Sequence, residues 1–433
     1  MRIGKRSPLI TLGLAAALMI PAAPAGALPG PSGPAGEIGV EIGFGRGGKF
    51  LDLSVTLGGH KRVVLELVKE YLAARDQGWR EPGGPGTAMA AIEAEGAEIG
   101  NQARTFATGP SKVAAEASAA EEGDLHATGV DTGFFDDAKV KFKGRTATVT
   151  ITSGTLLTWN DTALGDSSLS DTYIVTLERE GRTWTITDAS YAPIPSTAAP
   201  KPETPSSTTS TTEAKAAPDG VSTLAEHTYD RDAAVAYALR WSTVYKSRNG
   251  IVVHEARNTA EYDDLGTTNC ANFVSQALFA GGWPKRGGWN PRDPSNWTND
   301  LLQNSPTRTW VNANWLFDFA IEYRGYERNF WPPSDPTAEP GDPDFAVWEL
   351  QPGDLLFADW DTAVPDGVQD HVMIITGTYT SQGFTEPTYS QNSPNRHNLP
   401  LSIGMKMAYN GQYLDHGYQP VYTPVPLHDT FDY

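Results

Sequence analysis

The stretch TTNCANFVSQALFAGG, residues 267–282, contains Cys270, the single cysteine of a 433-residue chain. Asparagine is a preferred N-cap residue, so Asn269 predicts a helix that has Cys270 in its first turn. The following apolar residues recur at helical spacing and predict one buried stripe: Phe273, Val274, Ala277 and Leu278. Gly281 supplies a stop signal. This stretch therefore predicts a helix with its thiol at the positive end and one face in a core.

A thiol in the first turn of a helix lies close to unsatisfied backbone N–H groups, which favour the thiolate and lower the pKa. Proteins prepare cysteine nucleophiles in this way. The alternative is that Cys270 is a small buried apolar residue. Outside the cell an unpaired cysteine is oxidised unless it is buried or used, and a single cysteine excludes an intrachain disulfide. The compartment therefore bears on the role of Cys270.

The first 27 residues have the pattern of a secretory signal peptide. Basic residues precede an apolar run at residues 9–20, and small residues follow at 25–27. We expect cleavage near Ala27 and a secreted, extracellular protein that can associate with the cell wall. No later stretch is apolar enough for a membrane helix, so we expect no membrane insertion.

The net charge of −19 and the pI near 4.8 argue against binding to nucleic acid or to anionic membranes by bulk electrostatics. A hydrophobic content of 39% is sufficient for sizeable cores, and the length predicts two or three domains. We expect a monomer.

Composition divides the chain after the signal peptide. Residues 28–59 are rich in Gly, Pro and Ala and predict a flexible segment. Residues 192–226 are dense in Pro, Ser and Thr and predict an extended linker. The linker separates an α+β domain at 60–191 from a second domain at 227–433.

The first domain combines a helix with strands. Residues 60–76 have the spacing of an amphipathic helix, and residues from 138 onward alternate with period two, with turn signals at Gly144 and Gly181. Residues 80–125 give no clear pattern. A helix packed on a curved sheet resembles the cone-shaped folds of the nuclear-transport-factor type.

The second domain contains several motifs in a fixed order. A helix predicted from Tyr229 to Lys246 contains YDRDAAVAYAL, and NCANFVSQAL with GGW, SNWTNDL, QPGDLLFADW, DHVMIITG and YSQNS follow. This order resembles the putative amidase domain of secreted bacterial proteins, a papain-like family, over residues 229–410. The resemblance implies an α+β fold in which the cysteine helix packs on a small antiparallel sheet.

His371 stands at the head of a short apolar run that predicts a buried strand. In papain-like enzymes the helix supplies the cysteine and the sheet supplies the histidine. The resemblance therefore implies that Cys270 attacks an amide carbonyl and that His371 acts first as base and then as acid. The backbone N–H of Cys270 is the expected oxyanion donor.

A third polar residue normally orients the imidazole. The position after Ser-Gln in YSQNS falls on Asn392, and strand alternation is expected to point Gln391 to the other face. The family that the chain resembles more often has SQH at this point, with histidine at the position of Asn392. It also commonly has Asp before the cysteine, at the position of Asn269.

The sequence also suggests substrate contacts. Trp297, in SNWTNDL, is the best candidate for an aromatic wall of a cleft, although packing in the core is an equal alternative; Asn269 and Gln391 are further candidates. The acidic run DWDTAVPD fits no EF-hand spacing, so we assign no metal, and we expect no cofactor.

The leading hypothesis is a secreted papain-like cysteine hydrolase of an amide or peptide bond, plausibly in cell-wall peptidoglycan. One alternative is an acyltransferase of the same superfamily, in which an amine replaces water. The other is a non-catalytic protein that binds the cell wall or a partner with the same fold.

Overall fold

The computed structural model describes a series of segments between residues 57 and 432. These are residues 57–80, 90, 93, 98–120, 125–193, 226–246, 253–287, 290–300, 306–324, 346–360, 366–381, 384–408 and 420–432. The expected signal peptide, nearly all of the segment expected at 28–59 and most of the expected linker lie outside these residues. Among the described residues no helix is both long and apolar enough to span a membrane.

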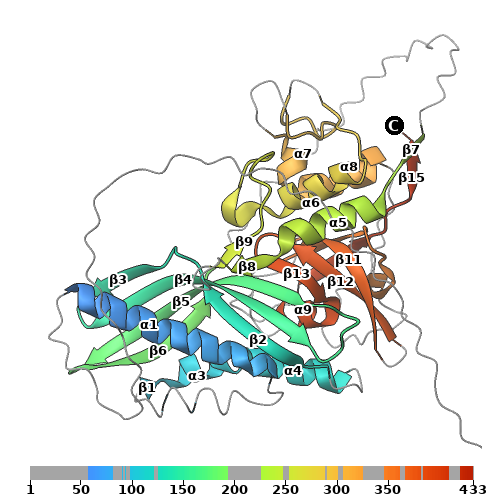
Figure 1. Ribbon diagram of the computed structural model, residues 1–433. Coiled ribbons are helices and arrows are strands. Elements are labelled where there is room, and N and C mark those ends of the chain that lie inside the picture. The colour runs from blue at the N-terminus through green and yellow to red at the C-terminus, as the bar shows by residue number, and fades with distance from the viewer. Residues whose placement is uncertain are drawn as a thin grey trace, which may run out of the picture. The chain divides into compact units, whose positions relative to one another are not determined.

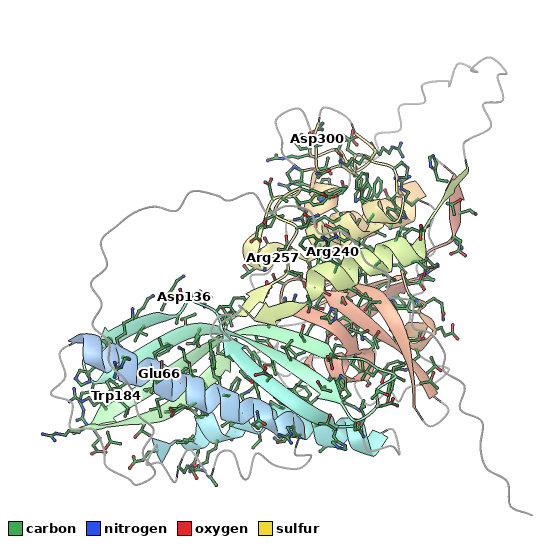
Figure 2. All side chains as sticks on the ribbon, in the orientation of Figure 1. Glu66, Asp136, Trp184, Arg240, Arg257 and Asp300 are labelled. Carbon is green, nitrogen blue, oxygen red and sulfur yellow. The ribbon has the colours of Figure 1, made fainter. Side chains whose placement is uncertain are left out.

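A long amphipathic helix opens the described chain. The helices and the short strand of this part are α1 (Leu57–Asp76), η1 (Gln77–Arg80), β1 (Glu98–Ile99), α3 (Asn101–Ala107) and α4 (Gly109–Ala120). The predicted helix at 60–76 is confirmed. Its residues Val64, Val68 and Leu72 are fully buried, whereas Glu66 is exposed on the outer face (Figure 2). Burial of one apolar stripe fixes α1 on the sheet.

The strands predicted by period two are also confirmed. They are β3 (Lys139–Lys143), β4 (Thr146–Trp159), β5 (Ser167–Glu180) and β6 (Thr183–Tyr191), and a strand that was not predicted, β2 (Ala127–Phe134), precedes them. Gly144 and Gly181 lie in the turns with φ of 62° and 59°, values that glycine adopts readily. Alternate residues of β4 point into the core, as Val149 and Ile151 show with 0% exposure.

The C-terminal half begins with helices and short strands. These are β7 (Glu226–Thr228), α5 (Arg231–Ser242), β8 (Val244–Lys246), β9 (Val253–Glu255), η2 (Gly266–Thr268), α6 (Cys270–Ala280), α7 (Arg308–Val311), α8 (Ala313–Arg324) and η3 (Ala346–Glu349). The side chain of Asp230 caps α5 by accepting a hydrogen bond from the backbone N–H of Ala233 at 2.9 Å.

The strands of this half follow the helices in sequence. They are β10 (Leu355–Asp359), β11 (His371–Ser381), β12 (Phe384–Gln391), β13 (Asn395–Pro400), β14 (Val421–Val425) and β15 (Thr430–Asp432), with α9 (Leu401–Met407) after β13. Helices α5 and α6 lie over the sheet formed by β11, β12 and β13 (Figure 1). Apolar residues of α6 share one core with Val372 and Ile374 of β11.

One mixed sheet of eleven strands runs through both halves, in the order β1-β6-β5-β13-β12-β11-β10-β14, with β2 and β3 paired to β4 and β4 paired to β5. The two halves meet where β13 pairs antiparallel with β5, with Asn395 opposite Ser170. A buried ion pair lies at the same place, because Arg396 Nη2 is 2.8 Å from Asp171 Oδ1 and both side chains are at most 6% exposed.

The fold is therefore mixed α+β, as expected. The papain-like classification and the cone-like first domain stay predictions. The joining of the two halves through β5 and β13 was not predicted, because the short segment NRHNLP at 395–400 gives no strand signal of its own.

Candidate active site

The helix α6 begins at Cys270, as the sequence predicted. Asn269 takes the N-cap position, but its side chain makes no capping hydrogen bond. Instead, its Oδ1 accepts a hydrogen bond from Asn272 Nδ2 at 2.8 Å. The start of the helix was therefore predicted correctly, and the capping role of the Asn269 side chain was wrong.

The thiol of Cys270 is buried beside the start of β11. Its side chain lies among buried residues with 4% exposure, and the sulfur interacts with the backbone N–H of Val372, the residue after His371. Burial raises the pKa of the thiol to about 11, and the N–H groups of Val372, Ala271 and Cys270 offset this only in part. The expected lowering of the pKa is wrong for this structure because desolvation exceeds the effect of the helix start.

The imidazole of His371 is also buried, with 2% exposure, and it stacks on Trp360 with ring centroids 4.1 Å apart and an interplanar angle of 14°. Burial lowers the pKa of His371 to about 3, and a hydrogen bond with the Gln391 side chain opposes that shift. The Nε2 atom is buried and has no hydrogen-bond partner among the described residues. At neutral pH the thiol and the imidazole are both uncharged.

The residue that holds the imidazole is Gln391 and not Asn392. The Gln391 side chain bonds with His371, and its Nε2 donates to the backbone oxygen of Pro394 at 3.0 Å. Asn392 Oδ1 lies 3.0 Å from Ser393 Oγ instead. The motif pointed to Asn392, whereas β11 and β12 pair with Ser390 opposite Ile374, and this register puts Gln391 on the face of Met373 and His371.

Trp297 lies in the core and lines no cleft. It is 0% exposed, its ring centroid is 4.6 Å from that of Trp310, and it stacks on Phe319 at 6.1 Å. Its Nε1 donates to Ser275 Oγ on α6 at 3.1 Å. Trp297 therefore supports the cysteine helix from behind, which corrects the prediction that it lines a cleft.

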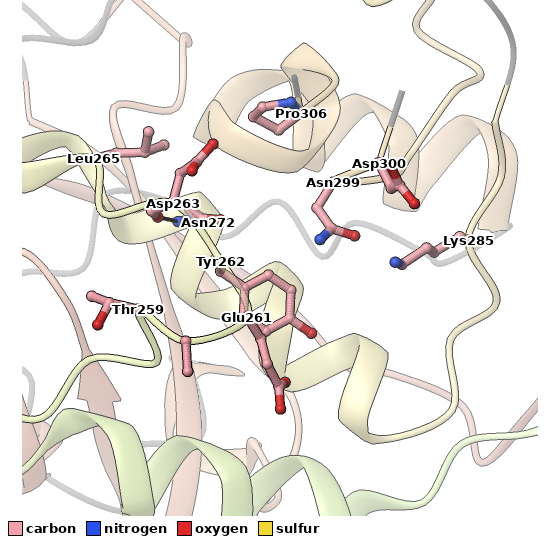
Figure 3. A pocket seen from close by; sticks show the side chains of 11 residues that line it. Thr259, Glu261, Tyr262, Asp263, Leu265, Asn272, Lys285, Asn299, Asp300 and Pro306 are labelled. Atoms are coloured by element: carbon pink, nitrogen blue, oxygen red, sulfur yellow. Dashed lines mark hydrogen bonds between the residues drawn. The ribbon is translucent and has the colours of Figure 1, made fainter. Parts of the chain in front are cut away.

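A cavity of about 380 Å³ adjoins the first turn of α6 (Figure 3). Residues of the loop before α6 form one side, and Asn272 of α6 contributes to the lining. The charged residues in the lining are three carboxylates and one ammonium, from Glu261, Asp263, Asp300 and Lys285. The lining is therefore negatively charged and suits a polar or cationic group.

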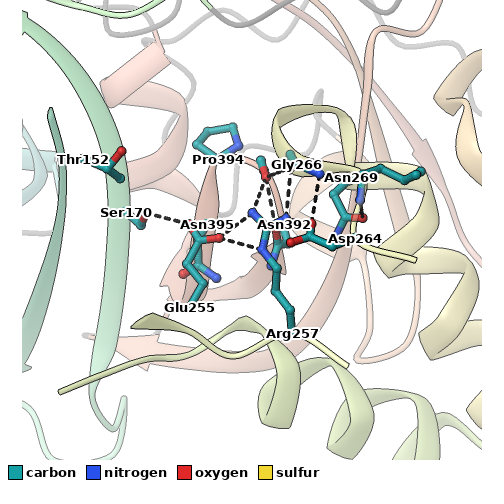
Figure 4. A network of polar contacts seen from close by, with 12 residues as sticks. Thr152, Ser170, Glu255, Arg257, Asp264, Gly266, Asn269, Asn392, Pro394 and Asn395 are labelled. Atoms are coloured by element: carbon teal, nitrogen blue, oxygen red, sulfur yellow. Dashed lines mark hydrogen bonds and ion pairs between the residues drawn. The ribbon is translucent and has the colours of Figure 1, made fainter. Parts of the chain in front are cut away.

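A polar network around Arg257 lies next to the site and was not predicted (Figure 4). We call it the Arg257 network; it comprises Ser170, Glu255, Arg257, Asp264, Gly266 and Ser393. A sequence gives little warning of such a network, because Ser170 and Ser393 lie far along the chain from the four members at 255–266.

The comparison with known families gives the same family as the order of motifs in the second half of the chain. Residues 228–414 match the family described as a putative amidase domain. This part of the chain carries a putative amidase domain. The range includes Cys270, His371 and Gln391 of the candidate site. No curated protein and no solved structure matched the chain.

Within the described part of this amidase domain and of the N-terminal half, no group of three or more His, Cys, Asp or Glu side chains gathers closely enough to hold a metal ion. The backbone N–H groups of Val372, Ala271 and Cys270 interact with the thiol, and the charge of the Asp370 carboxylate acts on it as well. The arrangement suits acid–base and nucleophilic chemistry by the protein's own side chains.

Proposed function

We propose that the amidase domain is a cysteine hydrolase that cleaves an amide or peptide bond through an acyl-enzyme on Cys270. The observation that carries this proposal is the placement of the thiol against the backbone N–H of Val372, the residue that follows His371 in the chain. A cysteine at the start of a helix and a histidine at the start of an adjacent strand have the relation that papain-like catalysis uses.

The proposed reaction starts from the neutral thiol and imidazole. As the sulfur attacks the carbonyl carbon, the thiol proton passes to His371, which burial keeps neutral and whose protonation the hydrogen bond with Gln391 favours. The imidazolium then protonates the leaving amine, and the C–N bond breaks. Water attacks the thioester in the second half and releases the acid, with His371 again taking the proton.

Two groups assist these steps. The backbone N–H of Cys270 lies at the start of α6 and is placed to donate to the oxyanion. Gln391 accepts from the ring and favours its protonated form, so it supports the imidazolium that forms during attack. Gln391 therefore takes the role that the sequence assigned to Asn392.

We propose peptidoglycan as the substrate, in keeping with the signal peptide expected at 1–27. The negatively charged cavity beside α6 offers space for a peptide stem that carries a free amine. Export to the cell exterior is part of the same proposal.

A non-catalytic binding protein is the second candidate. It is favoured by the burial of the Cys270 thiol, which raises its pKa to about 11, because a poorly ionised cysteine reacts slowly. Acyl transfer shares the acyl-enzyme with hydrolysis and differs in the second nucleophile.

The deciding experiment incubates the chain without its expected signal peptide with purified peptidoglycan and with simple amides, and records product masses. The Cys270→Ala variant should form no product. Gln391→Ala should lower kcat by about 10- to 100-fold because the imidazole loses its orientation, and the neighbouring Asn392→Ala should lower it less. Undiminished hydrolysis by Cys270→Ala would refute the mechanism, and amine adducts would indicate acyl transfer.

A further inference from the structure

We propose that Arg257 is a positioning residue that fixes the loop before Cys270 and the turn behind His371 relative to each other, and that the N-terminal half completes this clamp through Ser170. The inference rests on the proposed function and adds a residue that neither touches the substrate nor carries the chemistry.

The first arm of the clamp reaches the loop that leads into α6. Arg257 Nη1 donates to Gly266 O at 3.0 Å and also binds the Asp264 carboxylate. The same carboxylate accepts a hydrogen bond from Gly266 N at 2.9 Å. Three residues separate Gly266 from Cys270, so this arm holds the loop that leads directly into the helix.

The second arm reaches the turn after β12. Arg257 Nη2 donates to Ser393 Oγ at 3.1 Å, and that hydroxyl donates to Gly266 O at 2.8 Å (Figure 4). The same turn carries Pro394, whose backbone oxygen holds Gln391, the partner of the imidazole. One guanidinium thus connects the loop of the thiol to the support of the imidazole.

The third arm comes from the N-terminal half. Arg257 Nε donates to Glu255 Oε2 at 2.9 Å, and Glu255 Oε1 accepts a hydrogen bond from Ser170 Oγ at 2.6 Å. Ser170 lies on β5, where that strand pairs with β13. The side chains of Arg257 and Glu255 are 17% and 12% exposed, so water screens their interaction only in part.

A guanidinium suits this position because it presents five donors in a rigid plane, and here it serves four different residues. A lysine can supply charge but not this geometry. Small displacements of reacting groups lower rates strongly, so loosening the clamp should act on kcat rather than on KM.

The test uses the chain without its expected signal peptide and the variants Arg257→Ala, Arg257→Lys and Ser170→Ala. In Arg257→Ala we expect kcat on a cleaved amide to fall by about 10- to 100-fold, with KM changed by less than about twofold. Ethylguanidinium, which replaces the deleted atoms, should restore part of the lost rate. Arg257→Lys should remain impaired, and Ser170→Ala should show a smaller loss in the same direction.

The matched control is Arg240→Ala, because Arg240 is exposed on α5 and packs over Trp241 outside the network (Figure 2). It should keep the wild-type kcat and should not respond to ethylguanidinium. Circular dichroism and thermal unfolding establish that each variant is folded. If Arg257→Ala does not fold, Ser170→Ala carries the test.

A second measurement keeps this proposal separate from the proposed function. Release of the clamp should let water reach the thiol, so iodoacetamide should label Cys270 at least about tenfold faster in folded Arg257→Ala, because hydration lowers the thiol pKa. Absence of hydrolysis by the wild type would refute the proposed function, and labelling alone would then decide this inference. The inference would be overturned if Arg257→Ala and Ser170→Ala both kept the wild-type labelling rate and kcat. It would also be overturned if Arg257→Ala lost kcat and ethylguanidinium restored none of it.

Discussion

Alkylation of Cys270 tests the neutral state of the site directly, because the chain has no other cysteine. Thiolate is the reactive form, and the thiol pKa is raised from 9.0 to about 11. At about pH 7.5 the thiolate fraction is then about 0.03%, compared with about 3% for a thiol at its ordinary value. Iodoacetamide should therefore react about a hundredfold more slowly with the folded chain than with the unfolded chain.

The assay follows the mass increase of the intact chain over time between about pH 6 and pH 10.5, in buffer and in denaturant. The logarithm of the rate for folded protein should rise by about one per pH unit over this range, because the midpoint lies near 11. His371→Gln should preserve this slope, since a neutral imidazole contributes no charge to the thiol.

A rate that levels off below about pH 8 would refute this reasoning, above all if the plateau disappeared in His371→Gln. Such a result would show that the thiol and the imidazole form an ion pair in solution.

Three further predictions concern stability. Trp297→Ala should lower the free energy of unfolding by about 3–5 kcal/mol in a denaturant titration, since the ring is fully buried; a change below about 1 kcal/mol would contradict the core placement. Arg396→Met should lower the free energy of unfolding by about 3–5 kcal/mol, because Asp171 then remains buried without its partner. Adding Asp171→Leu should recover at least half of this loss. Burial lowers the pKa of His371 from 6.5 to about 3, so the contribution of His371 to the free energy of unfolding is complete above pH 6.5 and is lost as the pH falls toward 3, by about 1.4 kcal/mol per pH unit. In unfolding titrations at successive pH values, His371→Gln should flatten this decline. An unchanged slope would count against a buried neutral ring.

The sequence predicted most of the local structure around the site. The helix beginning at Cys270 and the strand beginning at His371 were both found, because an apolar period and turn residues act over a few neighbours along the chain. The helix over 60–76 and the hairpin turns at Gly144 and Gly181 follow from the same kind of signal.

Side-chain roles at the site were harder to predict. The choice between Gln391 and Asn392 depends on strand register, and the pairing of Ser390 with Ile374 puts Gln391 rather than Asn392 on the face of His371. Trp297 has the same local sequence whether it lines a cleft or fills a core, and its packing against Trp310 and Phe319 decides the matter.

The sequence by itself determined that one thiol stands at the start of a helix and that one histidine heads a buried strand. Only the tertiary structure decided that both are uncharged, since desolvation depends on every atom that excludes water from the site. It also decided that β5 pairs with β13 and that Arg257 connects Gly266 with Ser393. Hydrogen bonds between residues more than a hundred positions apart leave no periodic trace along a chain, so the fold alone brings their donors and acceptors together.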